Sequence, residues 1–154
     1  MEIHLFNNKI LFKYNDIIFL SRLLNGTYPA TSSIIPNQFE ISVECDYINL
    51  FEMIDRASLL TSDRDKNTIK LDLCDKELKI SSNSPEIGYV EEKMLVDNNG
   101  EISISFSSKY MLDAIKSFGQ SKVILYMNNE NSPIIIKSQD DDSLIQLVLP
   151  IKTY

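Results

Sequence analysis

Short apolar runs separated by polar turn residues make up the beginning of the chain. The runs are residues 2–6, 9–14 and 16–24, and neighbouring Asn and Asp residues separate them. Runs of this length with turn residues between them predict an antiparallel three-stranded meander. Three strands without a covering helix seldom form a core of their own, so we expect this meander to be the end of a larger domain.

The next part of the chain changes from a period of two residues to the period of a helix. Residues 39–45 alternate as a strand does, and Leu50, Ile54 and Ala57 then share one face of a predicted helix. Asp46 is placed to cap the start of that helix. Three further strands are predicted at residues 68–74, 77–82 and 87–95. The pattern therefore predicts a unit of one strand, one helix and three strands.

The same order of elements then occurs again. Residues 101–118 predict a strand followed by a helix, with Met111, Ile115 and Phe118 on its buried face. Ser107 or Ser108 is the expected helix cap. Three more strands are predicted at residues 121–127, 133–138 and 143–150.

The two units align with each other. Residues 40–42 and 101–103 are both Glu-Ile-Ser, an offset of 101 − 40 = 61 residues, and Ile54 and Ile115 match at the same offset. An internal repeat predicts two similar units related by a pseudo-twofold axis, with both helices on one side of a pair of antiparallel sheets. The alternative is chance similarity between two amphipathic strand-helix segments. The predicted fold class is α+β.

Composition narrows the class of protein. A hydrophobic fraction of 44% in 154 residues is enough for a sizeable core, and no apolar run approaches the roughly 18 residues that span a membrane. The chain begins without the features of a signal peptide, and Cys45 and Cys74 fit neither a disulfide framework nor a metal site. We therefore predict a cytoplasmic protein with reduced thiols. The formal net charge of −7 argues against a broad basic face for nucleic acid, although a few cations can still face DNA.

Residue patterns for catalysis or metal binding are scarce. His4 is the only histidine, and its place in a strand near the chain start indicates a surface position. Asp63, Asp65 and Asn67 imitate the opening of a calcium loop, but Thr68 stands where that loop requires glycine. We therefore predict a protein that is not an enzyme and has no metal or other cofactor, in which this segment is a solvated turn.

Two segments carry apolar residues whose place in a core is not evident. Residues 25–36 hold two of the five prolines, and residues 144–154 run from an apolar strand into a proline and a short tail. Core packing of Leu147 and Leu149 is one interpretation. The other is that the two segments form a binding surface.

An ordered series of five segments resembles a known family. The segments are FLSRLLNGTYPATSSIIP, IDRASLLTSD, ISSNSPEIG, FSSKYMLDAIKSF and SLIQLVLPIKTY. Together they are similar to the carboxy-terminal part of the bacterial DNA polymerase III beta subunit, the sliding clamp, in a Firmicutes-like form. The resemblance implies the DNA-clamp fold. Residues 1–36 would be the last strands and exit linker of the second clamp domain, and residues 37–154 the third domain.

The resemblance also implies a function. Sliding clamps are non-catalytic processivity factors that encircle duplex DNA, and their third domain has a hydrophobic pocket for linear peptides. The implied partners are the DNA polymerase III catalytic subunit, the clamp loader, other DNA polymerases and repair proteins. The implied pocket residues are Pro29, Ser33, Ile34, Tyr110, Pro133, Leu147, Leu149, Pro150, Ile151 and Lys152. Ser33 and Ala30 replace an arginine and an acidic residue that are usual in the family, so weaker polar contacts to a peptide are expected.

Other surfaces follow from the same resemblance. Leu59 and Leu60 would contact the partner subunit of a homodimeric ring, and Arg56, Lys109 and Lys116 would face DNA. Because the first domain and most of the second are outside these 154 residues, we expect a monomer or a weak dimer, with duplex DNA bound only in the full ring. The rival hypothesis is a free-standing peptide-binding module with the clamp fold that does not encircle DNA. An enzyme is the third hypothesis.

Overall fold

The computed structural model describes residues 1–28, 30–31, 34–119, 122–141 and 143–152 and consists of two compact units, Met1–Ile34 and Ile35–Tyr154. The smaller unit is the predicted meander. Its strands are β1 (Glu2–Leu5), β2 (Lys9–Tyr14) and β3 (Ile17–Arg22), all antiparallel and in the order β1-β2-β3. Ile3, Phe19 and Leu20 of this unit are each more than half exposed.

The larger unit contains the predicted repeat. The first copy comprises β4 (Ile41–Cys45), α1 (Tyr47–Ser58), β5 (Thr68–Cys74), β6 (Glu77–Ser84) and β7 (Gly88–Leu95), with a short 3-10 helix, Asp63–Asp65, before β5. The second copy comprises β8 (Ile102–Ser107), α2 (Ser108–Lys116), β9 (Val123–Met127), β10 (Ile134–Ser138) and β11 (Ile145–Val148). The order of one strand, one helix and three strands occurs twice, as the sequence predicts.

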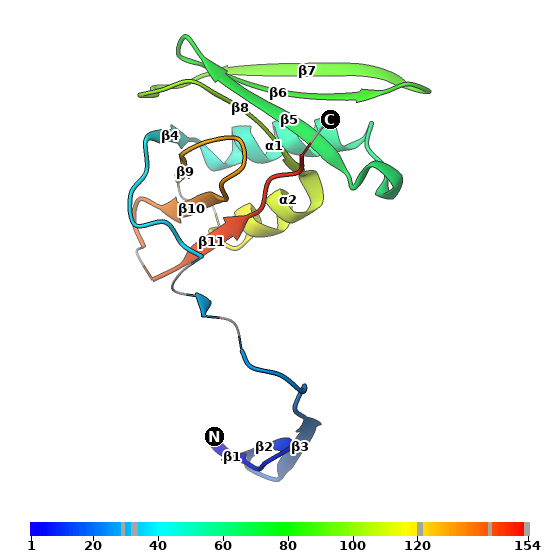
Figure 1. Ribbon diagram of the computed structural model, residues 1–154, viewed down its shortest axis with the longest axis vertical. Helices are drawn as coiled ribbons and strands as arrows, with labels where there is room; N and C mark the ends of the chain where they lie inside the picture. Colours follow the sequence, from blue (N-terminus) through cyan, green and yellow to red (C-terminus); the bar gives the residue numbers. More distant parts are fainter. Residues whose placement is uncertain (29, 32–33, 120–121, 142, 153–154) are drawn as a thin grey trace. The chain divides into compact units, whose positions relative to one another are not determined.

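The strands form two four-stranded antiparallel sheets, β11-β10-β9-β4 and β7-β6-β5-β8 (Figure 1). Each sheet takes three strands from one repeat and the first strand from the other: Val43 of β4 lies opposite Leu125 of β9, and Ile104 of β8 lies opposite Leu71 of β5. Helix α1 packs on β5, β6 and β7, helix α2 packs on β8 and β11, and the two helices contact each other. The exchange of first strands was not predicted, because periodicity does not specify strand partners.

A single core joins the two repeats. Leu50 and Ile54 of α1 and Met111 and Ile115 of α2 are fully buried, as their helical spacing predicts, and Phe106 at the end of β8 is buried with them. Burying side chains of this size contributes roughly 1.5–3 kcal/mol each. The two helices are therefore fixed by the same core that holds the sheets.

The two helices begin differently. Asp46 caps α1, and its carboxylate accepts a hydrogen bond from the backbone N–H of Asn49 at 3.0 Å. Ser107 occupies the same position before α2 but makes no side-chain capping bond. A side-chain oxygen at this position satisfies one of the free N–H groups of the first turn. The prediction of both cap positions is confirmed, and only α1 has the capping bond.

The segment that imitates a calcium loop is a turn held by its own hydrogen bonds. The carboxylate of Asp65 accepts from the backbone N–H groups of Ser62 and Asn67 at 2.9 and 3.0 Å, and Asp63 accepts from the Asn67 side-chain amide at 2.8 Å. Lys66 and Asn67 have φ angles of 59° and 53°, in the left-handed region. Both carboxylates therefore serve to hold the turn in its conformation.

The thiols differ in their surroundings. Cys45 is buried and Cys74 is exposed, and both are free cysteines. Burial, with Glu44 and Asp46 close by, raises the pKa of the Cys45 thiol to about 12.

Among the described residues, no helix has both the length and the apolar character needed to cross a membrane.

Candidate functional site

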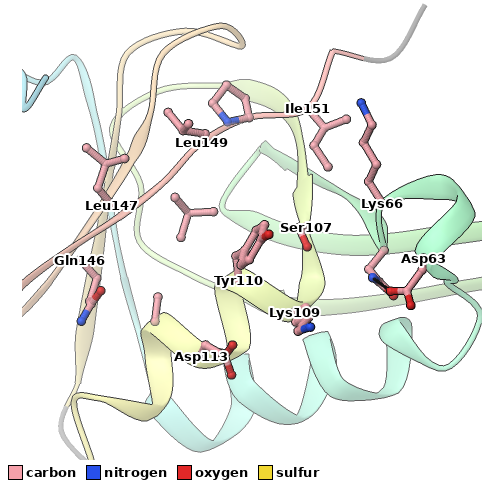
Figure 2. A pocket seen from close by; sticks show the side chains of 14 residues that line it. Asp63, Lys66, Ser107, Lys109, Tyr110, Asp113, Gln146, Leu147, Leu149 and Ile151 are labelled. Atoms are coloured by element: carbon pink, nitrogen blue, oxygen red, sulfur yellow. Dashed lines mark hydrogen bonds between the residues drawn. The ribbon is translucent and has the colours of Figure 1, made fainter. Parts of the chain in front are cut away.

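An open groove of about 750 Å³ lies where α2 begins and β11 ends (Figure 2). Its apolar side chains come from α2 and from β11 with the segment that follows it: Tyr110, Ala114, Leu147, Val148, Leu149, Pro150 and Ile151. Tyr110 is 67% exposed and Leu149 is 64% exposed. The groove therefore presents an aromatic ring and several aliphatic side chains to solvent, in a concave arrangement typical of ligand sites.

Backbone contacts fix the wall of this groove. After β11 the chain crosses to the edge of β8, where Pro150 forms a bridge with Phe106 and the Ile151 N–H donates to the Ser105 carbonyl oxygen at 2.7 Å. Phe106 is fully buried, so it ties the tail to the core. The wall is thus formed before any ligand arrives, which lowers the entropy cost of binding.

Polar side chains lie around the apolar floor. In Figure 2, Gln146 lies at one end of the groove and Lys66 lies beside Ile151 at the other, with Tyr110 between them. The Gln146 amide donates to the Ser117 hydroxyl at 3.1 Å. Within the part of the chain that the structure describes, the ammonium group of Lys66 forms no ion pair. A polar rim around an apolar floor gives a bound segment a preferred orientation.

The structure brings together part of the predicted pocket. Five of the predicted residues line the groove, namely Tyr110, Leu147, Leu149, Pro150 and Ile151. Lys152 instead lines a neighbouring hollow of about 240 Å³. Pro133 does not line the groove, because it precedes β10, which lies behind the edge strand β11 in the sheet.

The remaining predicted pocket residues come before the larger unit in the sequence. Pro29 and Ser33 lie outside the described residues. Ile34 is 46% exposed and belongs to the smaller unit, so it is not placed relative to the groove. The segment that follows is attached to the larger unit: the Asn128 side chain accepts from the Glu40 N–H at 2.8 Å and donates to the Gln38 carbonyl oxygen at 3.0 Å.

Some groove residues were missed in the sequence analysis. Asp113 and Ala114 lie three and four residues after Tyr110, so helical spacing was a signal that could have found them. Lys66 and Asn67 come from the turn before β5, which reaches the groove because the Ser108 N–H donates to the Asn67 carbonyl oxygen at 2.8 Å. No periodic pattern predicts that long-range contact.

The residues predicted to face a partner subunit lie at the end of α1. Leu59 is 75% exposed, as expected. Leu60 is half-buried and so less exposed than Leu59. The chain turns back there, and the Leu60 N–H donates to the Ala57 carbonyl oxygen at 3.4 Å. Leu59 is therefore the main apolar side chain at this end of the helix.

The cations predicted to face DNA lie in different electrostatic surroundings. The Arg56 guanidinium forms a two-bond contact with Glu92, at 2.5 and 2.6 Å, and a third bond with Glu52 at 3.2 Å. The hydrogen bond from Arg56 holds the pKa of the Glu92 carboxyl below its ordinary value. Lys116 lies over the ring of Phe51, with 5.5 Å from Nζ to the ring centroid. The charge of Arg56 is therefore largely balanced within the protein.

Comparison with known proteins identifies the same family that the sequence resembles. Residues 32–152 match the family described as "DNA polymerase III beta subunit, C-terminal domain". The beta sliding clamps of Staphylococcus aureus and Staphylococcus epidermidis are 42% and 40% identical to this chain over its whole length. The chain spans 41% of the length of these relatives.

Solved structures show the same fold. The DNA polymerase sliding clamp from Bacillus subtilis matches 99% of this chain and 41% of its own, with a TM-score of 0.87 and 39% identity. A sliding clamp from Pseudomonas aeruginosa bound to griselimycin matches 98% of this chain and 41% of its own, with a TM-score of 0.87 and 28% identity. Sliding clamps are non-catalytic subunits, in agreement with the prediction that the chain is not an enzyme. The chain belongs to the DNA polymerase III beta subunit family, the bacterial beta sliding clamps, and corresponds to their C-terminal part.

Proposed function

We propose that the groove at the end of β11 is the peptide-binding pocket of a sliding clamp, the processivity factor of a replicative DNA polymerase. The observation that carries this proposal is the preformed apolar concavity in which Tyr110, Leu149 and Ile151 meet. Its ligands are short linear segments of the polymerase catalytic subunit, the clamp loader, other DNA polymerases and repair proteins. A clamp of the same fold has been solved with griselimycin bound, which supports a ligand site on proteins of this kind.

A peptide of the Gln-Leu-x-Leu-Phe type fits the chemistry of this groove. Its Leu-Phe end would bury apolar surface against Leu147, Leu149 and Ile151. Burial of two such side chains contributes on the order of 3–6 kcal/mol before ordering costs. Even an optimal peptide is therefore expected to bind no more tightly than the micromolar range. By the family resemblance, Pro29, Ser33 and Ile34 would add further contacts to the peptide.

The domain assignment is part of the proposal. Residues 1–36 would belong to the end of the second clamp domain and residues 37–154 to the third, which carries the groove. In the complete clamp, the exposed Leu59 with Leu60 would contact the next subunit of a homodimeric ring. The proposed location is the cytoplasm, where bacterial DNA replication takes place.

Duplex DNA is proposed as a partner only within a closed ring. Lys109 and Lys116 are cations of α2, but Asp113 lies on the same helix and Arg56 is engaged by two carboxylates. Enclosure retains DNA without strong contacts, whereas an isolated chain needs several phosphate contacts. For the 154 residues alone we expect a dissociation constant weaker than about 10⁻⁶ M at physiological salt, measured by fluorescence anisotropy with a labelled duplex.

The engaged Arg56 also favours a second candidate function. A peptide-binding module with the clamp fold that does not encircle DNA has no need for cations on its helices. The two functions differ in one measurable property, since only a clamp in its full-length form stays on circular DNA and slides off after the DNA is cut. The peptide-binding module would be favoured if the protein is not retained on circular DNA, or if the amount retained does not change when the DNA is cut.

An NMR titration tests the shared part of both functions. We expect addition of Gln-Leu-Ser-Leu-Phe to shift the signals of Ile34, Tyr110, Leu149 and Ile151, because these side chains would contact the ligand. The matched control is Gln-Ala-Ser-Ala-Ala, which keeps the length and lacks the apolar end. Shifts spread over other surfaces, or an unchanged spectrum at millimolar peptide, would remove the proposal.

A further inference from the structure

A second groove lies at the corresponding corner of the first repeat. Its volume is about 690 Å³, close to that of the peptide groove. Asp46 and Asn49 of α1 line it, and the repeat offset of 61 residues relates them to Ser107 and Tyr110 of the peptide groove. Its other walls are the end of β7 with the segment after it and the strands β4 and β9: Met94, Leu95, Val96, Asp97, Ser42, Glu44, Lys122, Ile124 and Tyr126.

The second groove is built as the first one is. After β7 the chain crosses to the edge of β4, where Asn98 forms a bridge with Val43, as Pro150 does with Phe106 in the other repeat. The Ser42 N–H donates to the Asn99 side-chain oxygen at 2.8 Å. These bonds fix the wall at the end of β7 without a ligand, so this groove also has a low ordering cost.

Part of this groove is apolar. Leu95 is 86% exposed, the largest exposed fraction among the large hydrophobic side chains described for residues 35–154. Met94, Ile124 and Tyr126 are half-buried beside it. An aliphatic side chain of a partner that covers Leu95 would remove apolar surface of both partners from water.

The charged residues of this groove are mainly acidic. Three carboxylates, those of Glu44, Asp46 and Asp97, line it together with one ammonium group, that of Lys122. Glu44 forms an ion pair with Lys122, which leaves two carboxylates without a cation inside the groove. The same acidic surroundings add to burial in raising the pKa of Cys45, and the hydrogen bond that the Lys122 ammonium donates to Glu44 raises the pKa of Lys122.

We propose that this second groove docks a basic peptide segment in which Arg or Lys lies next to an aliphatic residue. The aliphatic side chain covers Leu95 and Ile124, and the cation lies between Asp46 and Asp97. Complementary charge selects such a segment and disfavours an acidic one. The two grooves of one domain therefore take peptides of different chemistry, and the second groove does not depend on the function proposed for the first.

A titration with acetyl-Gly-Arg-Leu-Lys-Gly-amide tests the inference. We expect saturable shifts at Leu95, Asp97 and Ile124, with affinity that falls about threefold or more between 50 and 200 mM salt, because part of the binding is electrostatic. D97N is expected to weaken binding about fivefold and L95A about tenfold. D141N is the control at a distant acidic turn, and acetyl-Gly-Glu-Leu-Glu-Gly-amide is the control peptide.

Specific outcomes would overturn the inference. Equal binding of the acidic peptide, shifts at Leu149 and Ile151 in place of Leu95, or no saturation at millimolar peptide would each contradict it. Leu95 is a surface residue, so L95A should keep the native spectrum, which shows that lost binding reflects the groove and not the fold. If both L95A and D97N bind as the unchanged chain does, the basic peptide does not dock here.

Discussion

The two grooves occupy the same corner of the two repeats and are lined by different side chains. Tyr110 of the peptide groove corresponds to Asn49 of the second groove at the repeat offset, and the peptide groove has Leu149 and Ile151 in its wall whereas the second groove has Leu95 and Asp97. In both, the chain leaves the last strand of the repeat and bridges to the first strand of the same repeat. The backbone therefore determines that a groove forms, and the side chains determine what it can bind.

The largest expected effect comes from two buried residues at equivalent positions of the two repeats. Phe106 and Cys45 are related by the repeat offset, and both are buried. Phe106→Ala should lower the free energy of unfolding by about 3–5 kcal/mol, because it removes a large fully buried side chain, and Cys45→Ala by roughly 1 kcal/mol. Urea denaturation of the two variants measures the difference. Equal losses would mean that the two corners depend on the core to the same extent.

The next effect separates the ligands of the two grooves. Leu149→Ala should weaken binding of the Gln-Leu-Ser-Leu-Phe peptide by about 1–3 kcal/mol, because it removes apolar surface from the peptide groove. Leu95→Ala should leave that affinity unchanged, because Leu95 lies in the other groove. Calorimetric titration of both variants is the measurement. A similar loss in both would show that the grooves are not independent.

A smaller effect is expected at the helix caps. Asp46→Ala should lower the free energy of unfolding by about 1 kcal/mol, because the carboxylate holds the Asn49 N–H. Ser107→Ala should lower the free energy of unfolding by only a few tenths of a kcal/mol, because the Ser107 side chain makes no capping bond. Thermal denaturation of the two variants compares them, and a larger loss for Ser107 would contradict the assignment of the caps.

The smallest effect is expected outside both grooves. Asp141 lies on an exposed turn and accepts a hydrogen bond from the Ser143 N–H at 2.8 Å. Asp141→Asn should leave the affinities for the apolar and the basic peptide unchanged within error, because the residue lines neither groove. A change in either affinity would show that binding extends beyond the residues that line the grooves.

Much of this architecture was predictable from local patterns. Leu50, Ile54, Met111 and Ile115 are buried because helical spacing places each pair on one face, and Asp46 is a favourable cap residue. Strand alternation located the three strands that follow each helix. These features depend on residues close together in the sequence, so periodicity and cap chemistry are enough to find them.

The features that were not predicted depend on long-range contacts. Arg56 pairs with Glu92, 36 residues later, and the turn that carries Lys66 reaches the peptide groove through a backbone bond to the start of α2. The edge position of β11 similarly decides that Leu149 lines the groove and Pro133 does not. No local pattern specifies which distant segments meet, so residue types alone could not place these side chains.

The exchange of β4 and β8 between the two sheets has a topological consequence. Neither repeat completes a four-stranded sheet by itself, because each gives its first strand to the other. The larger unit therefore has the connectivity of a domain-swapped dimer whose two copies have been fused into one chain through residues 96–101. Each half presents the strand that the other half lacks, so a chain cut in this link would give two pieces that complement each other. Folding of the unit must bring the two halves together, since no sheet can close before they meet.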